Sequence, residues 1–161
     1  MRLVATTQWV MLAYRLPRTP STPRITLWRK LRRLGVAQIV DGVVALPATA
    51  DTREQLEWLA EDVVQAGGDA TIWLARPATA AEDRRLAAAM TRRIDEEYRT
   101  ITSQAHAAAG TPPLQRRRTL ARLRRELRRV GAREFFPSDH ATAARDAVEA
   151  LAQRIAEETA A

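Results

Sequence analysis

The chain of 161 residues contains no cysteine, a single lysine and few aromatic side chains, which make up 5% of it. Without cysteine it has no disulfide, no thiolate zinc site and no cysteine nucleophile, which suits a reducing compartment. No apolar run approaches the roughly 18 residues that a membrane span needs. These absences favour a cytoplasmic protein that has no membrane partner.

Patterns typical of catalytic or metal sites are also missing. The two histidines, His106 and His140, are far apart in the sequence, and no carboxylates accompany them at the spacing of metal ligands. The sequence has no glycine-rich phosphate loop and no nucleophile elbow. We therefore expect no metal, no other cofactor and no enzymatic activity.

Positive charge is the property that the chain has in excess. The formal net charge is +7, and Lys30 is the only lysine among 26 basic residues. Such a balance favours an anionic partner: nucleic acid, an acidic protein, a membrane surface or an oxyanion. An arginine-rich genome is an alternative explanation of the excess, although it does not explain clustering.

The first 77 residues read as strand, helix, two strands, helix and strand. Ser21-Thr22-Pro23 opens the first helix, and Gly35 ends it. Asp41-Gly42 predicts a two-residue type I′ turn, which needs positive φ at both positions. Asp51 and Glu54 predict a capping box on the second helix, which ends at Gly67-Gly68. The predicted strands are Gln8–Tyr14, Ala37–Val40, Val43–Leu46 and Ala70–Leu74.

This order predicts the α+β class with a ferredoxin-like β-α-β-β-α-β core, in which two helices cover one face of a four-stranded antiparallel sheet. The opposite face needs a cover, either later helices or a second copy of the chain. Three further helices are expected over Ala80–Ala109, Gln115–Val130 and Ser138 or Asp139 to about Glu158. We expect residues 1–77 to form the core and residues 78–161 a helical extension packed on it, as one compact unit.

The four tryptophans lie on predicted strands and helices that need a core. We interpret them as packing residues, and a ligand-stacking set is the alternative. They are Trp9, Trp28, Trp58 and Trp73.

Arginine crowds the helix predicted over 115–130, whose leucine stripe leaves two basic flanks for solvent. Guanidinium groups bind phosphates in a bidentate manner, so this helix is the candidate nucleic-acid surface. A solvated basic helix is the alternative. No helix-turn-helix pattern is present, so reading of bases is not predicted. The predicted DNA-binding residues are Arg116, Arg117, Arg118, Arg122, Arg124, Arg125, Arg128 and Arg129, with Arg32 and Arg33 of the first helix.

A second basic group surrounds the beginning of the first helix. A helix N-terminus favours anions, and arginine donors suit a tetrahedral dianion such as chromate. The alternative is that these side chains are exposed or contact acids such as Asp41. The predicted oxyanion-binding residues are Arg15, Arg18, Arg24, Arg29 and Lys30.

Several segments together resemble the N-terminal domain of the ChrB chromate-resistance regulators. The resemblance rests on Gln8–Pro17, Pro23-Arg24, Trp28–Gly35, Asp41–Val43, Leu46-Pro47, Thr52–Leu59, Gly67–Thr71 and Arg133–Pro137. It implies a chromate-responsive transcriptional regulator that binds DNA. The first eighty residues more distantly resemble the middle domain of PaaX repressors and the small subunit of CRISPR spacer-acquisition complexes, which implies a homodimer. Those CRISPR relatives have an acidic residue where this chain reads Tyr14–Pro17, so a nuclease is not expected.

ChrB proteins usually continue into a second domain, whereas this sequence stops at Ala161. We expect a single-domain member or the separate N-terminal half of a split pair. The alternative function is therefore a protein-interaction module, whose basic helix docks an acidic partner or a separately encoded ChrB C-terminal domain.

Overall fold

A computed structural model describes residues 7–161 of the chain. The chain divides into two compact units, Met1–Met90 and Thr91–Ala161, where we expected one. The division falls inside the long helix α3 (Ala80–Ala108) and not after residue 77.

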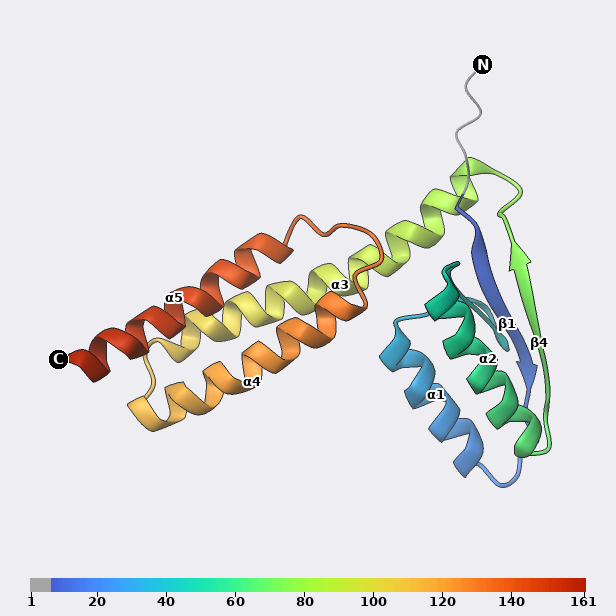
Figure 1. Cartoon of the computed structure of the whole chain (residues 1–161), viewed down its shortest axis with the longest axis horizontal. Helices are drawn as coiled ribbons and strands as arrows, with labels where there is room; N and C mark the ends of the chain where they lie inside the picture. Colours follow the sequence, from blue (N-terminus) through green and yellow to red (C-terminus); the bar gives the residue numbers. More distant parts are fainter. Residues whose placement is uncertain (1–6) are drawn as a thin grey trace, which may run out of the picture. The chain divides into compact units, whose positions relative to one another are not determined.

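The first unit contains a four-stranded sheet and two complete helices (Figure 1). Its elements are β1 (Trp9–Arg15), α1 (Thr22–Leu34), β2 (Ala37–Val40), β3 (Val43–Pro47), α2 (Ala50–Gln65) and β4 (Asp69–Ala75). The strand order is β2-β3-β1-β4, and every pair is antiparallel. The predicted α+β class and the β-α-β-β-α-β order are confirmed, and the strand ends shift by one residue at most.

One face of the sheet forms the core of this unit. Val10 and Leu12 of β1 are fully buried, and they pair in register with Leu46 and Val44 of β3, which are buried as well. The two helices cover this face with their apolar sides (Figure 1). Their buried aliphatic residues are Leu27, Leu31, Leu56, Leu59 and Val63.

The opposite face is covered at one end. Trp9 is 1% exposed, and its Nε1 donates a 2.8 Å hydrogen bond to Asp83 near the start of α3. Farther along the same face, Trp73 stands next to Met11 in the register, and 59% of it is exposed. The first turns of α3 therefore provide part of the expected cover.

The prediction that all four tryptophans are core residues is wrong for three of them. Trp28 and Trp58 are 41% and 60% exposed, like Trp73 on the edge strand. Trp28 follows buried Leu27 and Trp58 precedes buried Leu59, so at about 100° per residue each lies beside the buried stripe of its helix and not in it. Helix membership alone does not bury a tryptophan.

The Asp41-Gly42 connection is not a type I′ turn. Gly42 has φ of 77°, whereas no described residue other than glycine has positive φ. The β2–β3 register shifts between Gln38 and Val40 instead. Gly42 also accepts a 2.8 Å hydrogen bond from the Tyr14 amide, and a Cβ there would lie 2.6 Å from the Tyr14 carbonyl oxygen.

The caps of the first two helices differ from the predictions. The capping box of α2 consists of Thr49 and Thr52, whose hydroxyls accept each other's backbone N–H at 3.0 and 2.9 Å. Asp51 does not serve because the N-cap is Thr49, two residues earlier than expected. Ser21 stands at the N-cap of α1 without a capping hydrogen bond from its side chain, while Gly35 ends the helix as predicted, with φ of 75°.

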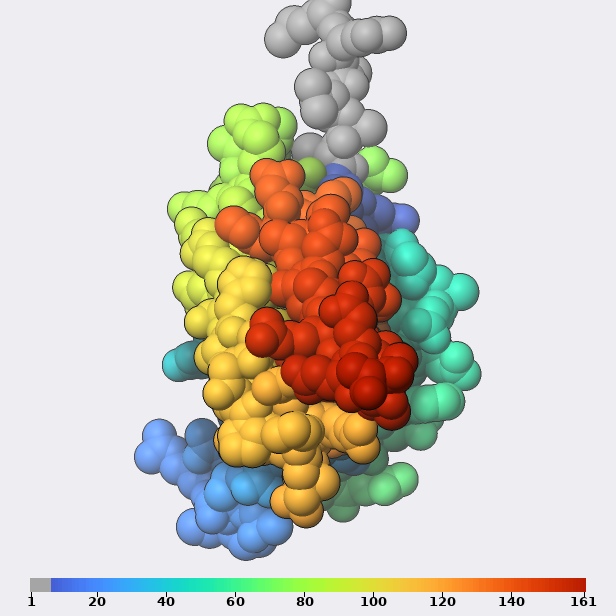
Figure 2. All heavy atoms as spheres, turned by 90° about the vertical axis from the view of Figure 1, so that its left-hand side faces the viewer, coloured from blue at the N-terminus to red at the C-terminus, as the bar shows by residue number. Residues whose placement is uncertain are grey.

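The second unit packs the rest of α3 against α4 (Pro113–Ala132) and α5 (Ala141–Ala160). Its core consists mainly of Ile94, Tyr98, Ile101, Ala105, Ala108, Leu120, Leu123, Val130, Ala141, Ala144, Ala147, Val148 and Leu151. Figure 2 faces the end of this bundle, where the last turns of α5 lie beside the α3–α4 connection. The helix α4 continues through Gly131, its expected stop.

The start of α5 also differs from the prediction. His140 is its N-cap, and neither Ser138 nor Asp139 caps it. The Ser138 hydroxyl donates instead to Asp95 of α3 at 2.5 Å and accepts the His140 amide at 3.1 Å. It therefore connects the loop before α5 to α3.

Candidate nucleic-acid interface

Helix α4 carries eight arginines and one glutamate. Leu120, Leu123 and Val130 form the stripe that packs into the core of the second unit. At about 100° per residue, the arginines occupy most of the remaining circumference. The stripe therefore fixes the orientation of the helix and, with one exception, turns the arginines away from the core.

Arg116 is the exception and a correction to the predicted DNA-binding set. Only 7% of it is exposed. Its guanidinium pairs with Glu158 of α5 and donates a 2.5 Å hydrogen bond to the Thr111 carbonyl oxygen, while its Nε has no partner among the described residues. Arg116 therefore ties the first turn of α4 to the end of α5 and is not available to a ligand at the surface.

Two other arginines of the predicted set make polar contacts with neighbouring helices. Arg117 donates to the Thr159 hydroxyl on α5 at 2.9 Å and remains exposed. Arg122 donates to Gln104 of α3 and to Glu126 of its own helix, both at 2.8 Å. These contacts show that the two flanks of α4 adjoin different helices, α5 on the Arg117 side and α3 on the Arg122 side.

The remaining five arginines of α4 are exposed. Within the part of the chain that the structure describes, their guanidinium groups make no hydrogen bond or ion pair. They are Arg118, Arg124, Arg125, Arg128 and Arg129. The eight predicted residues on α4 thus separate into one that is buried, two with polar partners and five that are unpaired.

This arrangement is unfavourable for the helix by itself. Arg124 and Arg128 are four residues apart, as are Arg125 and Arg129, and like charges at this spacing repel one another. The first turn of α4 also contains no acidic residue. The carboxylate near the N-terminal end of the helix dipole, which favours anions, is Glu158 of α5, and it is paired with Arg116.

The basic residues of α1 have a structural explanation as well. Arg32 and Arg33 are exposed and stand in the last turn of the helix, where cations complement the helix dipole. Lys30 of the same helix pairs with Asp62 of α2 at 2.6 Å. Arg32 and Arg33 remain candidate phosphate ligands of the first unit.

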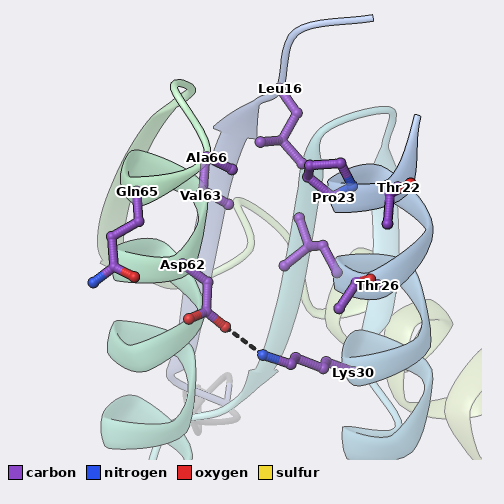
Figure 3. Close-up of a pocket in the computed structure, with 10 residues that line it drawn as sticks. Leu16, Thr22, Pro23, Thr26, Lys30, Asp62, Val63, Gln65 and Ala66 are labelled. Atoms are coloured by element: carbon purple, nitrogen blue, oxygen red, sulfur yellow. Dashed lines mark hydrogen bonds and ion pairs between the residues drawn. The ribbon is translucent and has the colours of Figure 1, made fainter. Parts of the chain in front are cut away.

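The predicted oxyanion-binding residues do not surround one cavity. The cavity between α1 and α2, about 380 Å³ in volume, has Lys30 as the only one of the five in its lining (Figure 3). Figure 3 shows that Lys30 is already paired with Asp62, and the remaining lining includes apolar Leu16, Pro23 and Val63. This cavity therefore offers an oxyanion no unpaired cation.

The other four residues of that set lie on the surface. Arg15 pairs with Asp69 at 2.8 Å, and both side chains are highly exposed. Arg18, Arg24 and Arg29 are exposed. Burial raises the pKa of the Tyr14 hydroxyl, while Arg24 lowers it and Asp41 raises it, so both charges act at the end of β1. These positions fit the alternative interpretation of this set, in which the basic side chains are exposed or lie near acids such as Asp41.

Sequence reasoning missed one basic residue. Arg145 of α5 is exposed and lines a cavity together with Arg124 and Arg128 of α4. The surrounding helix is rich in acids, so its charge pattern did not indicate Arg145 as a ligand of an anion. Its proximity to α4 depends on how the helices pack, and the repeat of α4 alone does not reveal it.

Residues 7–161 contain neither a metal-binding cluster nor a membrane-spanning helix. No group of three histidine, aspartate or glutamate side chains is placed to hold a metal ion. No helix there combines the length and the apolar character required to cross a bilayer.

Two comparisons with known proteins identify relatives of the chain. The family described as "Protein ChrB, N-terminal" matches residues 24–108, which is more than half of the chain and ends before α4. Protein ChrB of Cupriavidus metallidurans is 35% identical over 68 residues, which are 42% of this chain and 20% of that protein. The chain thus spans about a fifth of the curated relative. No solved structure matches. The chain belongs to the ChrB N-terminal family.

Proposed function

We propose that the chain is the DNA-binding part of a chromate-responsive transcriptional regulator of chromate resistance, and that the exposed arginines of α4 hold DNA phosphates. Membership of the ChrB family supports the regulatory role. One observation supports the surface: five exposed arginines of one helix have no partner among the described residues. Guanidinium groups in this state keep all their donors for phosphate oxygens.

The proposed contacts are electrostatic. Arg118, Arg125 and Arg129 lie at helical spacings of seven and four, so they form one row along α4. Arg117, Arg124 and Arg128 form a second row on the side of α5. Two such rows fit the two phosphate strands that border a groove, and they fix position without reading bases. A homodimer in the cytoplasm is part of the proposal.

Fluorescence anisotropy with the duplex upstream of the chain's own gene tests this proposal, with an unrelated duplex of equal length as a control. Six phosphate contacts would give a slope of log K against log salt of about −5. The triple variant Arg124→Ala/Arg125→Ala/Arg128→Ala is expected to lose binding, and added chromate to weaken binding by the wild type. Binding by the triple variant with wild-type affinity and salt dependence would contradict the proposal.

A second function is favoured by the exposed tryptophans. Trp58 and Trp73 are 60% and 59% exposed, and large aromatic side chains on a surface are typical of protein interfaces. In this alternative the chain is a protein-interaction module, and its basic helix docks an acidic partner or a separately encoded ChrB C-terminal domain. Trp58→Ala would then abolish co-purification of that domain, whereas the DNA-binding proposal predicts that this variant binds the duplex like the wild type.

A further inference from the structure

The second unit contains a cavity between α4 and α5 that differs from the one in Figure 3. Its volume is about 580 Å³. Arg124 and Arg128 line it from α4, Arg145 lines it from α5, and Tyr98 and Glu134 contribute as well. All five residues belong to Thr91–Ala161, so the cavity is formed within one compact unit.

The three arginines form an unneutralised cationic group. Arg124 and Arg128 are on the same side of α4 because they are four residues apart. All three are exposed, and their guanidinium groups have no hydrogen bond or ion pair within residues 7–161. Bringing three like charges to one cavity is unfavourable unless an anion joins them.

The single carboxylate in the lining is already engaged. Glu134 accepts hydrogen bonds from the Tyr98 hydroxyl at 2.5 Å and from the Ser138 amide at 2.9 Å. Tyr98 itself is 2% exposed, so it is a fixed donor. Glu134 is thereby held by neutral donors and forms no ion pair with the arginines.

The protonation of Tyr98 supports this arrangement. Burial first, and then the hydrogen bond to Glu134, raise the pKa of Tyr98 to about 12, although the charge of Arg145 acts in the opposite direction. The hydroxyl is therefore protonated at neutral pH and remains a donor to Glu134. Three guanidinium groups and one carboxylate leave a formal charge of +2 at the cavity.

We propose that the cavity bordered by Arg124, Arg128 and Arg145 binds a small tetrahedral dianion of the sulfate or phosphate type. A dianion balances the formal charge, and each guanidinium presents a planar pair of donors to two of its oxygens. The cavity is wider than such an ion, and the remaining space admits water, each molecule of which occupies roughly 30 Å³. The unpaired arginines of two facing helices thus acquire a common ligand.

The proposal also predicts how the ligand would regulate the chain, and this part rests on the proposed function. Arg124 and Arg128 belong both to the cavity and to the proposed DNA surface. A dianion held by Arg145 would neutralise these two guanidinium groups and would compete with DNA phosphates for them. Free oxyanion would therefore weaken DNA binding beyond the general effect of ionic strength.

Binding of the ion is tested first and without DNA. Sodium sulfate, phosphate and chromate are titrated into the full chain by calorimetry, with sodium chloride at equal ionic strength as the reference. Wild type is compared with Arg145→Gln, which removes one cavity guanidinium, and with the matched control Arg118→Gln, which removes an exposed α4 arginine outside the cavity. We expect at least a tenfold weaker affinity for Arg145→Gln and less than a twofold change for Arg118→Gln.

Three results would overturn the site: sulfate acting no more strongly than chloride, Arg145→Gln binding as wild type, or Arg118→Gln losing as much affinity. The thermal shift produced by each ion gives an independent readout, because a ligand that binds only the folded state raises its melting temperature. Circular dichroism of each variant shows whether it is folded.

A second arm separates this site from the proposed function. The DNA complex is titrated with sulfate and with chloride at equal ionic strength, for wild type and Arg145→Gln. We expect an extra dissociation by sulfate that Arg145→Gln lacks. Arg145-dependent sulfate binding without any DNA binding would support the site and overturn the proposed function. DNA binding without sulfate binding would overturn only the site.

Discussion

The double variant Arg125→Gln/Arg129→Gln separates a binding surface from a structural one, because the two roles predict opposite changes. Both residues are exposed on α4, and their guanidinium groups have no partner in the described chain. Glutamine has nearly the helix propensity of arginine, so the substitution leaves the intrinsic preference of the helix almost unchanged. What changes is the charge.

The effect on folding follows from the helical neighbours. Arg125 faces Arg128 and Arg129 at spacings of three and four, and each like-charge pair costs about 0.2–0.5 kcal/mol. Removal of both charges relieves these two pairs but also removes the attraction between Arg129 and Glu126 three residues before it, so the free energy of unfolding rises by at most about 1 kcal/mol at low salt. For a cooperative unit of this size the melting temperature rises by a few degrees.

The effect on DNA binding has the opposite sign. Loss of two phosphate contacts makes the slope of log K against log salt shallower by about 2 and weakens binding roughly 10- to 100-fold near 100 mM salt. Calorimetry for unfolding and anisotropy for binding measure the two effects on the same samples. The control is Arg84→Gln/Arg85→Gln, which removes two exposed charges from α3.

The control distinguishes local contacts from net charge, since both double variants lower the charge equally. The reasoning is refuted if Arg125→Gln/Arg129→Gln lowers the melting temperature, because the side chains would then have stabilising partners. An unchanged salt slope, or an equal loss in both double variants, would refute the proposed contacts.

Three further predictions concern the stability of the two units, each measured as the free energy of unfolding in urea. Glu158→Ala leaves the Arg116 guanidinium buried without its carboxylate and should cost about 2 kcal/mol. Arg116→Met should cost less, because the half-exposed Glu158 that remains can reach water. Equal costs of the two variants would contradict this asymmetry. Burial opposes ionisation of Asp83, but hydrogen bonds from the Thr7 amide and the Trp9 indole lower its pKa. The stabilisation by Asp83 is therefore fully present above about pH 4 and is lost as the pH falls through the folded-state pKa. Asp83→Ala should cost about 1–3 kcal/mol at pH 7 and less in acid, and a cost independent of pH would count against this reasoning. Gly68→Ala places a Cβ 2.2 Å from the Arg15 carbonyl oxygen and 2.9 Å from Val63 Cγ1, so a loss of about 2 kcal/mol or more is expected, and wild-type stability would show that the backbone there yields freely.

The arrangement of elements was predictable because several local signals agree. Short β-branched runs are bounded by Pro17, Gly35 and Gly67-Gly68, and each boundary restricts where a strand or helix can continue. The observed strand ends differ from the expected ones by one residue at most. Two compact units were not predictable in this way, because the helix that spans both has no break in its apolar repeat.

The capping and turn predictions failed where two neighbouring residues offered the same chemistry. Thr49 and Asp51 both supply an oxygen for an N-cap, and only the exact start of α2 decides between them. The Asp41-Gly42 pair fits several turns, and the shifted register of β2 selects one in which Gly42 alone has positive φ.

The failures on Arg116 and Trp58 have a common physical cause. A periodic pattern gives the side of a helix, but burial also depends on the width of the neighbouring element. Arg116 lies on the core side of α4 near its end, where Glu158 of α5 is within reach. Trp58 lies beside the stripe of α2, where 60% of it remains exposed. The Arg116–Glu158 pair is hard to predict because the two residues are far apart in the sequence. The exposure of Trp58 is hard to predict because tryptophan is usually assigned to a core.

The cavity arginines illustrate the same limit for function. The spacing of Arg124 and Arg128 is visible in the sequence, but Arg145 comes from a helix with several acids. Only the packing of α5 on α4, through residues such as Val148 and Leu151, brings it to the same cavity. A charge pattern on one helix therefore predicts an anionic partner more readily than it predicts a specific pocket.

An arginine-rich composition explains why arginine replaces lysine, but it does not explain where acids are absent. Several basic groups elsewhere in the chain pair with carboxylates, as Arg53 does with Glu57 and Arg133 with Glu97, although α1 also contains no acid. On α4 the single acid is Glu126, and it neutralises Arg122. A compositional bias that acts on all helices would leave α4 with acids as frequent as those of its neighbours. Since the unpaired row lowers the stability of the free helix, its presence is better explained by an anion that neutralises it.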